Sequence, residues 1–385
     1  MSSFESTFPT RIVYGYRSVD RVGLEARRIG LKGRCMLVTG RSFARSSGYL
    51  DRIKSILEAE GYDVYVFDRV KPNPTIVDVE DGVNQARAIG IDFFVAFGGG
   101  SAIDTAKMVS VASSLGGSIE DYLYPRIVDE PIKPVVAIPT TCGTGSEVTR
   151  YAIVTIGFRK LIVAGWSLVP RIAILDPETL RFLPADQVAY TGVDALTHGL
   201  EAYFNRNASI LSDIYAIEAI KVVLRNLEDA YKGLMEAKAM LLYGSMNGGF
   251  AINMTGTTMI HGGGYYLTAK YGLPHGLANA LILLPILKLN MEAQSDRAIK
   301  LASILGLPAF DFKNASSSIL EAIASIMDRI GIPVGLEAAG IPIEDIGRIA
   351  EEALTYRRNL ENNPRSLGLD ELVDVFRSVY RSRGV

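Results

Sequence analysis

The chain has 385 residues, of which 48% are hydrophobic and 21% are charged, and its formal net charge is −2 at pH 7. A single hydrophobic core rarely serves more than about 250–300 residues, so this length predicts two domains. The near-neutral charge gives no basic field and argues against a nucleic-acid-binding protein, while the composition is typical of a globular enzyme.

The beginning of the chain and its cysteines predict where the protein works. Residues 1–5 (MSSFE) contain neither a cationic n-region nor an apolar h-region, so no signal peptide is expected. No apolar run is expected to reach the roughly 20 residues that span a bilayer, so no membrane partner is expected. Cys35 and Cys142 form no CxxC pair, which favours reduced thiols and a cytoplasmic protein.

In the first half of the chain, strand-like and helical segments alternate. Strands are predicted at residues 10–16, 34–40, 63–68, 92–97, 134–139 and 171–176, with a β-rich insert at 151–156 and 160–165. Helices are predicted at residues 49–60, 76–89 and 104–115. This alternation indicates a parallel sheet that is covered by helices on both faces.

After residue 177 the pattern changes to helical periodicity. Examples are residues 210–227, 236–254, 277–290, 317–330, 343–356 and 369–380. We therefore predict a domain boundary near residue 178, with an α/β domain over residues 1–178 and an all-helical domain over residues 179–385.

Two polar, glycine-rich loops follow predicted strands. In residues 98–107 (GGGSAIDTAK), glycines let backbone N–H groups approach a pyrophosphate at a helix N-terminus. This is not the GxGxxG fingerprint, and a tight turn with Ser101 as helix cap is the structural alternative. Residues 138–149 (IPTTCGTGSEVT) add hydroxyl groups, although such a loop alone is equally typical of structure. Together the two loops favour a cofactor-binding site.

The histidines suggest a metal site. Asp194 and His198 are four residues apart, which places them on one helix face. The only other histidines are His261 and His275, both in glycine-rich surroundings. Nitrogen and oxygen ligands of this kind suit Fe²⁺ or Zn²⁺. With one carboxylate and neutral imidazoles the loaded site is expected to be net positive. The alternatives are a helix cap for Asp194 and hydrogen-bonded core histidines.

These motifs resemble those of the iron-containing (group III) alcohol dehydrogenases. The matching segments are residues 71–74 (KPNP), 98–107, 138–149, 191–198 (TGVDALTH) and 274–280 (PHGLANA). The resemblance implies a Rossmann-like dinucleotide-binding domain, an all-α domain, a dehydroquinate synthase-like architecture and an active site in the cleft between the domains. It also implies that Asp194, His198, His261 and His275 bind the catalytic metal, usually Fe²⁺ and in some members Zn²⁺.

The resemblance further implies a reaction and its contacts. The metal would act as a Lewis acid on the substrate oxygen while hydride passes between a primary alcohol or short diol and the nicotinamide. Cofactor contacts are implied at Asn73, Gly99, Gly100, Ser101, Asp104, Thr140, Thr141, Thr149 and Lys160. A homodimer is implied as well, with residues 11–14 as an inter-subunit edge.

Two positions depart from the family pattern. Many members have a non-ligand histidine for proton transfer where this chain has Tyr265. Tyr265 is therefore a candidate proton relay, and Tyr266, ribose hydroxyls, water or metal-bound water are the alternatives. NAD-preferring members commonly have an aspartate after the first strand, where this chain has Gly40, Arg41 and Ser42. Gly40 removes the repulsion of a 2′-phosphate, and its two neighbours offer a charge and a hydroxyl, so NADP(H) is expected over NAD(H). The alternatives are a solvated turn residue for Arg41 and a surface lysine for Lys160.

Three other functions remain open. A Zn²⁺-dependent dehydrogenase of glycerol or glycerol phosphate type is disfavoured by the full histidine set and by Gly40. A non-redox lyase of the dehydroquinate synthase kind is disfavoured because basic residues are sparse between Asp194 and His275. A catalytically inactive metal-binding oligomer is disfavoured by the intact ligand set. The individual alcohol or aldehyde is not predicted.

Overall fold

The computed structural model describes residues 6–384, which divide into two compact units. The α/β unit comprises Ser6–Thr141 and Gly145–Leu183, and the helical unit comprises Cys142–Thr144 and the chain from Pro184 onward. The expected lack of a signal peptide concerns residues 1–5, which lie outside the described residues. The domain boundary expected near residue 178 concerns functional domains, and it stays a prediction.

Six parallel strands form the sheet of the α/β unit in the order β1-β8-β5-β4-β2-β3. Their bounds are β1 (Arg11–Tyr14), β2 (Arg34–Gly40), β3 (Asp63–Val70), β4 (Phe93–Gly98), β5 (Val135–Pro139) and β8 (Ile172–Leu175). The insert forms an antiparallel pair, β6 (Tyr151–Ile156) and β7 (Arg159–Ala164). The predicted parallel sheet is confirmed, and its order reverses between β2 and β4, where nucleotides bind in such sheets.

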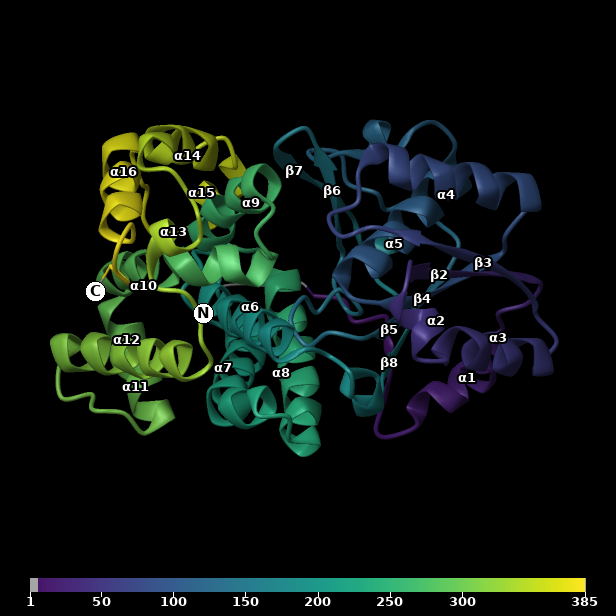
Figure 1. Ribbon diagram of the computed structural model, residues 1–385, viewed down its shortest axis with the longest axis horizontal. Coiled ribbons are helices and arrows are strands. Elements are labelled where there is room, and N and C mark those ends of the chain that lie inside the picture. The colour runs from purple at the N-terminus through teal and green to yellow at the C-terminus, as the bar shows by residue number, and fades with distance from the viewer. Residues whose placement is uncertain (1–5, 385) are drawn as a thin grey trace. The chain divides into compact units, whose positions relative to one another are not determined.

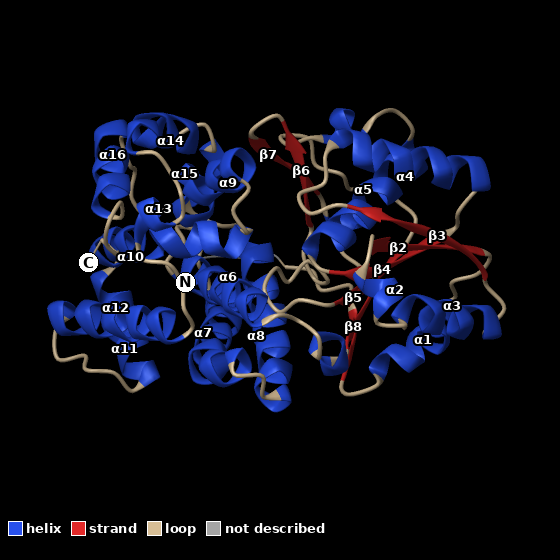
Figure 2. Cartoon of the chain, in the orientation of Figure 1, coloured by secondary structure: helices blue, strands red, loops and turns tan. Residues whose placement is uncertain are grey.

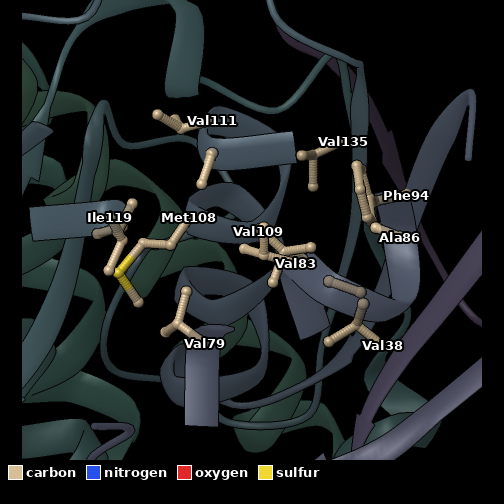
Figure 3. Packing of buried hydrophobic residues seen from close by; sticks show 14 of the residues in the cluster. Val38, Val79, Val83, Ala86, Phe94, Met108, Val109, Val111, Ile119 and Val135 are labelled. Carbon is tan, nitrogen blue, oxygen red and sulfur yellow. The ribbon is translucent and has the colours of Figure 1, made fainter. Parts of the chain in front are cut away.

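Helices cover both faces of this sheet, because the side chains that point to either face of the strands are apolar and must be buried. Helices α4 (Ile76–Ile89) and α5 (Gly100–Leu115) lie on one side, and α1 (Val22–Arg28), α2 (Phe43–Ser46) and α3 (Tyr49–Ala59) on the other (Figure 1). Figure 3 shows Val38 and Phe94 of the sheet beside Val83 and Val109 of the helices. Burial of each such side chain stabilises the unit by about 1.5–3 kcal/mol.

Helix α5 begins at Gly100, four residues before the predicted start at residue 104. Gly99 is its N-cap, in an extended conformation and without a side-chain cap. The glycines therefore open the helix rather than forming a loop in front of it. Its first N–H groups are consequently available to a ligand at the carboxyl end of β4.

The helical unit contains no strand among its described residues (Figure 2). Its helices are α6 (Ala185–Tyr203), α7 (Ile210–Tyr231), α8 (Met235–Thr255), α9 (Met259–Tyr271), α10 (His275–Ala293), α11 (Ser295–Leu305), α12 (Phe312–Arg329), α13 (Gly335–Ala338), α14 (Ile346–Ala353), α15 (Arg357–Asn362) and α16 (Leu369–Ser378). Helix α6 packs against α7, α8 and α10. The predicted all-helical second part is confirmed.

One apolar stretch is longer than the sequence led us to expect. Helix α10 has 19 residues and a mean hydropathy of 1.3, enough by length and composition to cross a membrane. However, 78% of that stretch is buried inside the structure, as in the core helix of a globular unit. Cys35 and Cys142 are both free and buried.

Candidate metal centre and nucleotide-binding site

Three of the four predicted metal ligands converge in the helical unit. Asp194 comes from α6, His261 from α9 and His275 from the first position of α10. One ligand atom of each lies within 4.8 Å of the others. His261 Nε2 is 3.5 Å and His275 Nε2 is 3.8 Å from Asp194 Oδ1. Two imidazole nitrogens and a carboxylate oxygen around one point form a donor set that fits a single divalent ion.

The fourth predicted ligand, His198, lies beside this group. Its ring stacks on the ring of His261 with centroids 4.7 Å apart. Its Nδ1 is 3.1 Å from the carbonyl oxygen of Gly143, so Nδ1–H donates and Nε2 keeps its lone pair for a metal. Burial lowers the pKa of His198, which favours the neutral ring that ligation requires. Its role as fourth ligand stays a prediction.

Glycines allow the ligand-bearing helices to approach one another. The run after His261 lies inside α9. A Cβ at Gly264 would lie 2.1 Å from Asn279 Oδ1, and one at Gly263 would lie 2.7 Å from Ile282 Cδ1. At Gly276 it would lie 1.9 Å from the carbonyl oxygen of Tyr190 in α6. These contacts explain why the ligands are surrounded by glycine, since no larger residue fits between the helices.

Two buried residues beside the ligands were not predicted. Glu201 accepts hydrogen bonds from the ring Nδ1 and the backbone N–H of His261. The Nδ2 atom of Asn279 lies 3.0 Å from Asp194 Oδ1, 3.2 Å from His261 Nε2 and 3.3 Å from His275 Nε2, while its Oδ1 has no hydrogen-bond partner among the described residues. The available signal was their spacing, because Glu201 lies three residues after His198 and Asn279 four after His275.

In the α/β unit, several predicted cofactor contacts lie together. The backbone N–H of Asn73 donates to Ser101 Oγ at 3.2 Å, and Lys160 Nζ donates to Asn73 Oδ1 at 2.6 Å. Asn73 has a φ of 55°, a left-handed conformation that is uncommon outside glycine. The segment after β3, the start of α5 and the β7 strand therefore meet at these three side chains.

The threonines lie against the same glycines. The backbone N–H of Thr140 donates to the carbonyl of Gly98 at 3.0 Å. A Cβ at Gly99 would lie 3.1 Å from Thr141 Cγ2, so the two loops after β4 and β5 touch. Gly100 follows as the first residue of α5. The structure thus brings these predicted contacts together at the carboxyl ends of β4 and β5.

A buried lysine that we did not predict holds this loop. Lys107 Nζ donates to the carbonyl oxygens of Thr149 at 2.8 Å and Tyr151 at 2.9 Å, and to Ser146 Oγ at 3.0 Å. Asp104 accepts from Ser146 Oγ at 2.6 Å and from a backbone N–H of β6 at 3.0 Å. Asp104 and Thr149 therefore already have protein partners, and their roles as cofactor contacts stay predictions.

The segment after β2 borders a cavity of about 560 Å³. Arg41, Arg69 and Lys71 are its basic lining residues, together with acidic residues of α4. Arg69 and Lys71 pair with Asp81 and Asp78. Arg41 forms no ion pair among the described residues. Gly40 leaves space, since a Cβ there would lie 3.8 Å from the nearest backbone oxygen, and Ser42 is exposed.

Comparison with known proteins shows the family of this chain. Residues 9–177 match the family described as iron-containing alcohol dehydrogenase, and residues 188–380 match the Fe-containing alcohol dehydrogenase family, C-terminal. The chain belongs to the iron-containing alcohol dehydrogenase family. It is 32% identical to 1,3-propanediol dehydrogenase of Citrobacter freundii over 98% of this chain and 99% of that protein.

Further relatives extend this result. The chain is 31% identical to NAD-dependent methanol dehydrogenase of Bacillus methanolicus, over 96% of this chain and 98% of that protein. It also matches a crystal structure of 1,3-propanediol oxidoreductase with a TM-score of 0.93 and 31% identity, over 98% of this chain and 100% of that one. This alcohol dehydrogenase family member is thus an oxidoreductase of alcohols or aldehydes with an iron-type metal site and a nicotinamide cofactor.

The metal centre contains a second buried carboxylate beside its ligands. Glu201 is a second buried carboxylate, and among the described residues neither Glu201 nor Asp194 has a lysine or arginine partner. Burial opposes a charged ring, but the carboxylates of Glu201 and Asp194 raise the pKa of His261 to about 10. A divalent ion that displaced the proton on His261 Nε2 would take over the interaction with these two carboxylates. The net positive charge expected of the loaded site counted only the ligand carboxylate Asp194, and it stays a prediction.

Tyr265 packs against the ligands. Its ring stacks on the ring of His275 with centroids 5.7 Å apart, and its hydroxyl bonds to the side chain of Thr257. Burial raises the pKa of Tyr265 above its ordinary value, which disfavours release of its proton. These contacts favour a packing role, while the relay role stays a prediction.

Proposed function

We propose that this enzyme interconverts primary alcohols or short diols with aldehydes, with Fe²⁺ as metal and NADP(H) preferred over NAD(H). The overall reaction is alcohol plus NADP⁺ to aldehyde plus NADPH and a proton. Support for the substrate class comes from the relatives, which are named for 1,3-propanediol and methanol, both primary alcohols. Zn²⁺ suits the same donor set, so the choice of Fe²⁺ rests on the family.

Each unit would contribute one part of this chemistry. Asp194, His198, His261 and His275 would hold the metal, which when bound supplies Lewis acidity toward the substrate oxygen. Asn279 keeps the Asp194 carboxylate in place through its 3.0 Å hydrogen bond. In the α/β unit, the N-terminus of α5 would bind the pyrophosphate, with Lys160 beside it for a ribose hydroxyl or phosphate.

The proposed cofactor preference rests mainly on two adjacent residues, Gly40 and Arg41. No carboxylate stands at Gly40 to accept a ribose 2′-hydroxyl or to repel a 2′-phosphate. Arg41 is exposed, lines the 560 Å³ cavity and has no acidic partner among residues 6–384. An arginine without a partner is well suited to a phosphate, because its planar fork makes paired charge-assisted hydrogen bonds.

A homodimer is the proposed assembly, with a cytoplasmic location. Strand β1 lies at one edge of the sheet, so its outer backbone groups are available for pairing with another chain. Tyr14, at the end of this strand, is 44% exposed. Light scattering of the purified protein would measure the assembly directly.

The Gly40→Asp variant tests the cofactor preference. The space at Gly40 accepts a side chain, so the fold should tolerate the change. The variant should lose roughly tenfold or more in the ratio of NADPH to NADH kcat/KM, since a new carboxylate repels the 2′-phosphate and accepts the ribose hydroxyl. An unchanged ratio in a folded variant would contradict the proposed NADP(H) preference.

A further inference from the structure

We propose that Glu201 is the positioning residue that sets the ring of His261 for metal binding, and that it thereby determines metal affinity. This inference rests on the proposed metal site and names a residue that acts through a ligand. Glu201 lies on α6, one turn after His198, and its side chain is fully buried.

Both carboxylate oxygens of Glu201 are used. Oε1 accepts from the backbone N–H of Thr258 at 3.0 Å, the hydroxyl of Thr258 at 2.7 Å and the backbone N–H of His261 at 3.1 Å. These donors belong to the first turn of α9, whose N-cap is Thr258. Oε2 faces Nδ1 of His261. A single carboxylate therefore fixes the start of the helix and the ring it carries, and it suits the positive end of the helix dipole.

This arrangement determines the tautomer of His261. A carboxylate can only accept, so Nδ1 must carry a proton, and the Nε2 lone pair is left to face Asp194 Oδ1 and the metal position. A carboxylate behind a ligating imidazole also makes the ring a more basic ligand. The same carboxylate contributes one of the two buried negative charges that a divalent ion would neutralise.

Replacement by glutamine separates these effects from packing. In Glu201→Gln, the amide oxygen must take the place of Oε1, because three donors of α9 converge there. The NH₂ group then faces His261 Nδ1, which must accept, and the proton moves to Nε2, where it blocks the ligand position. Loss of an outer partner of a ligating histidine typically weakens metal binding by 10–100-fold.

The test uses Zn²⁺ as the probe, because it is diamagnetic and redox-inert. Zn²⁺ dissociation constants would be measured by chelator competition for the full-length wild type, Glu201→Gln and the control Glu352→Gln. Glu352 is also a buried glutamate of the helical unit, but it pairs with Arg348. We expect Glu201→Gln to bind Zn²⁺ about 10–100-fold more weakly and Glu352→Gln to remain within about twofold.

A second readout does not depend on the variant folding. The chain has only three histidines, so ¹⁵N-histidine labelling gives a sparse NMR spectrum of the Zn²⁺-loaded wild type. It should show His261 with a proton on Nδ1 that is strongly deshielded by Glu201. Its absence, or a folded Glu201→Gln protein with wild-type Zn²⁺ affinity, would overturn the inference. Failure to oxidise NADPH would overturn the proposed function alone, since neither readout uses turnover.

Discussion

The side-chain amide of Asn279 donates a 3.0 Å hydrogen bond to Asp194 Oδ1, and both residues are fully buried or nearly so. The same amide nitrogen is within 3.3 Å of Nε2 of His261 and His275. One helix, α10, thus provides both a ligand at its first residue and, one turn later, a group that orients the carboxylate ligand from α6. Close packing against Gly264 makes this possible.

Replacing Asn279 by alanine should weaken metal binding. The variant leaves the buried Asp194 carboxylate without its neutral donor, and a hydrogen bond to a charged group contributes about 1.5–3 kcal/mol. We expect a roughly tenfold or larger loss of Zn²⁺ affinity in chelator competition. Asn290→Ala is the matched control, because Asn290 is buried on the same helix about four turns beyond His275 and forms no hydrogen bond to a ligand among the described residues. Equal Zn²⁺ affinities of the two variants would show that Asn279 does not orient the site.

Removal of the metal from the wild type and from His198→Ala tests whether His198 is the fourth ligand. A chelator should lower Tm of the wild type by roughly 5–10 °C, because a ligand present at about 1,000 times its Kd stabilises a folded protein by about 4 kcal/mol. His198→Ala should bind Zn²⁺ at least about tenfold more weakly and show a smaller chelator-induced shift. If differential scanning calorimetry shows the wild-type shift in His198→Ala, three ligands suffice.

Two neighbouring arginines separate the 2′-phosphate contact from general charge. Arg41 has no acidic partner among the described residues, whereas Arg45 pairs with Asp68. Arg41→Ala should raise the Kd of NADPH roughly tenfold while changing that of NADH less than about twofold. Arg45→Ala also removes one positive charge, but it should change the Kd of neither cofactor greatly. Fluorescence titration measures the Kd of NADPH and of NADH. An equal loss of affinity for the two cofactors in Arg41→Ala would contradict a specific contact between Arg41 and the 2′-phosphate.

Cofactor affinity should depend on pH through Lys160. Burial lowers the pKa of Lys160 to about 8, and the Asp104 carboxylate offsets this only in part. Below that pH the ammonium is charged and favours the anionic dinucleotide; above it the charge is lost. The Kd of NADPH should therefore rise about tenfold from pH 7 to pH 9. The arginine of Lys160→Arg keeps its charge throughout this pH range and should flatten the rise in Kd. If the Kd of NADPH still rises with pH in Lys160→Arg, another group is responsible for the titration.

The strands were predictable, because alternation of apolar segments depends on local periodicity alone. The grouping of Asp194 with His261 and His275 was expected from the family resemblance, since residues from three different helices share no local spacing. Glu201 lies three residues after His198 and Asn279 four after His275, but their roles become visible only when the helices pack. The glycines within α9 disfavour a helix by propensity, and only their tertiary contacts, such as those of Gly264 with Asn279 and of Gly263 with Ile282, explain them. Lys107 was missed for a similar reason, since its partners Thr149 and Tyr151 are more than 40 residues away in the chain.

The central claim is metal-dependent hydride transfer with NADPH. We would measure NADPH consumption with butanal under anaerobic conditions with added Fe²⁺, in the presence and absence of a chelator. We predict turnover that the chelator abolishes and that added Fe²⁺ restores. No turnover in protein that demonstrably contains the metal would contradict the account and favour glycerol-type substrates or non-redox lyase chemistry.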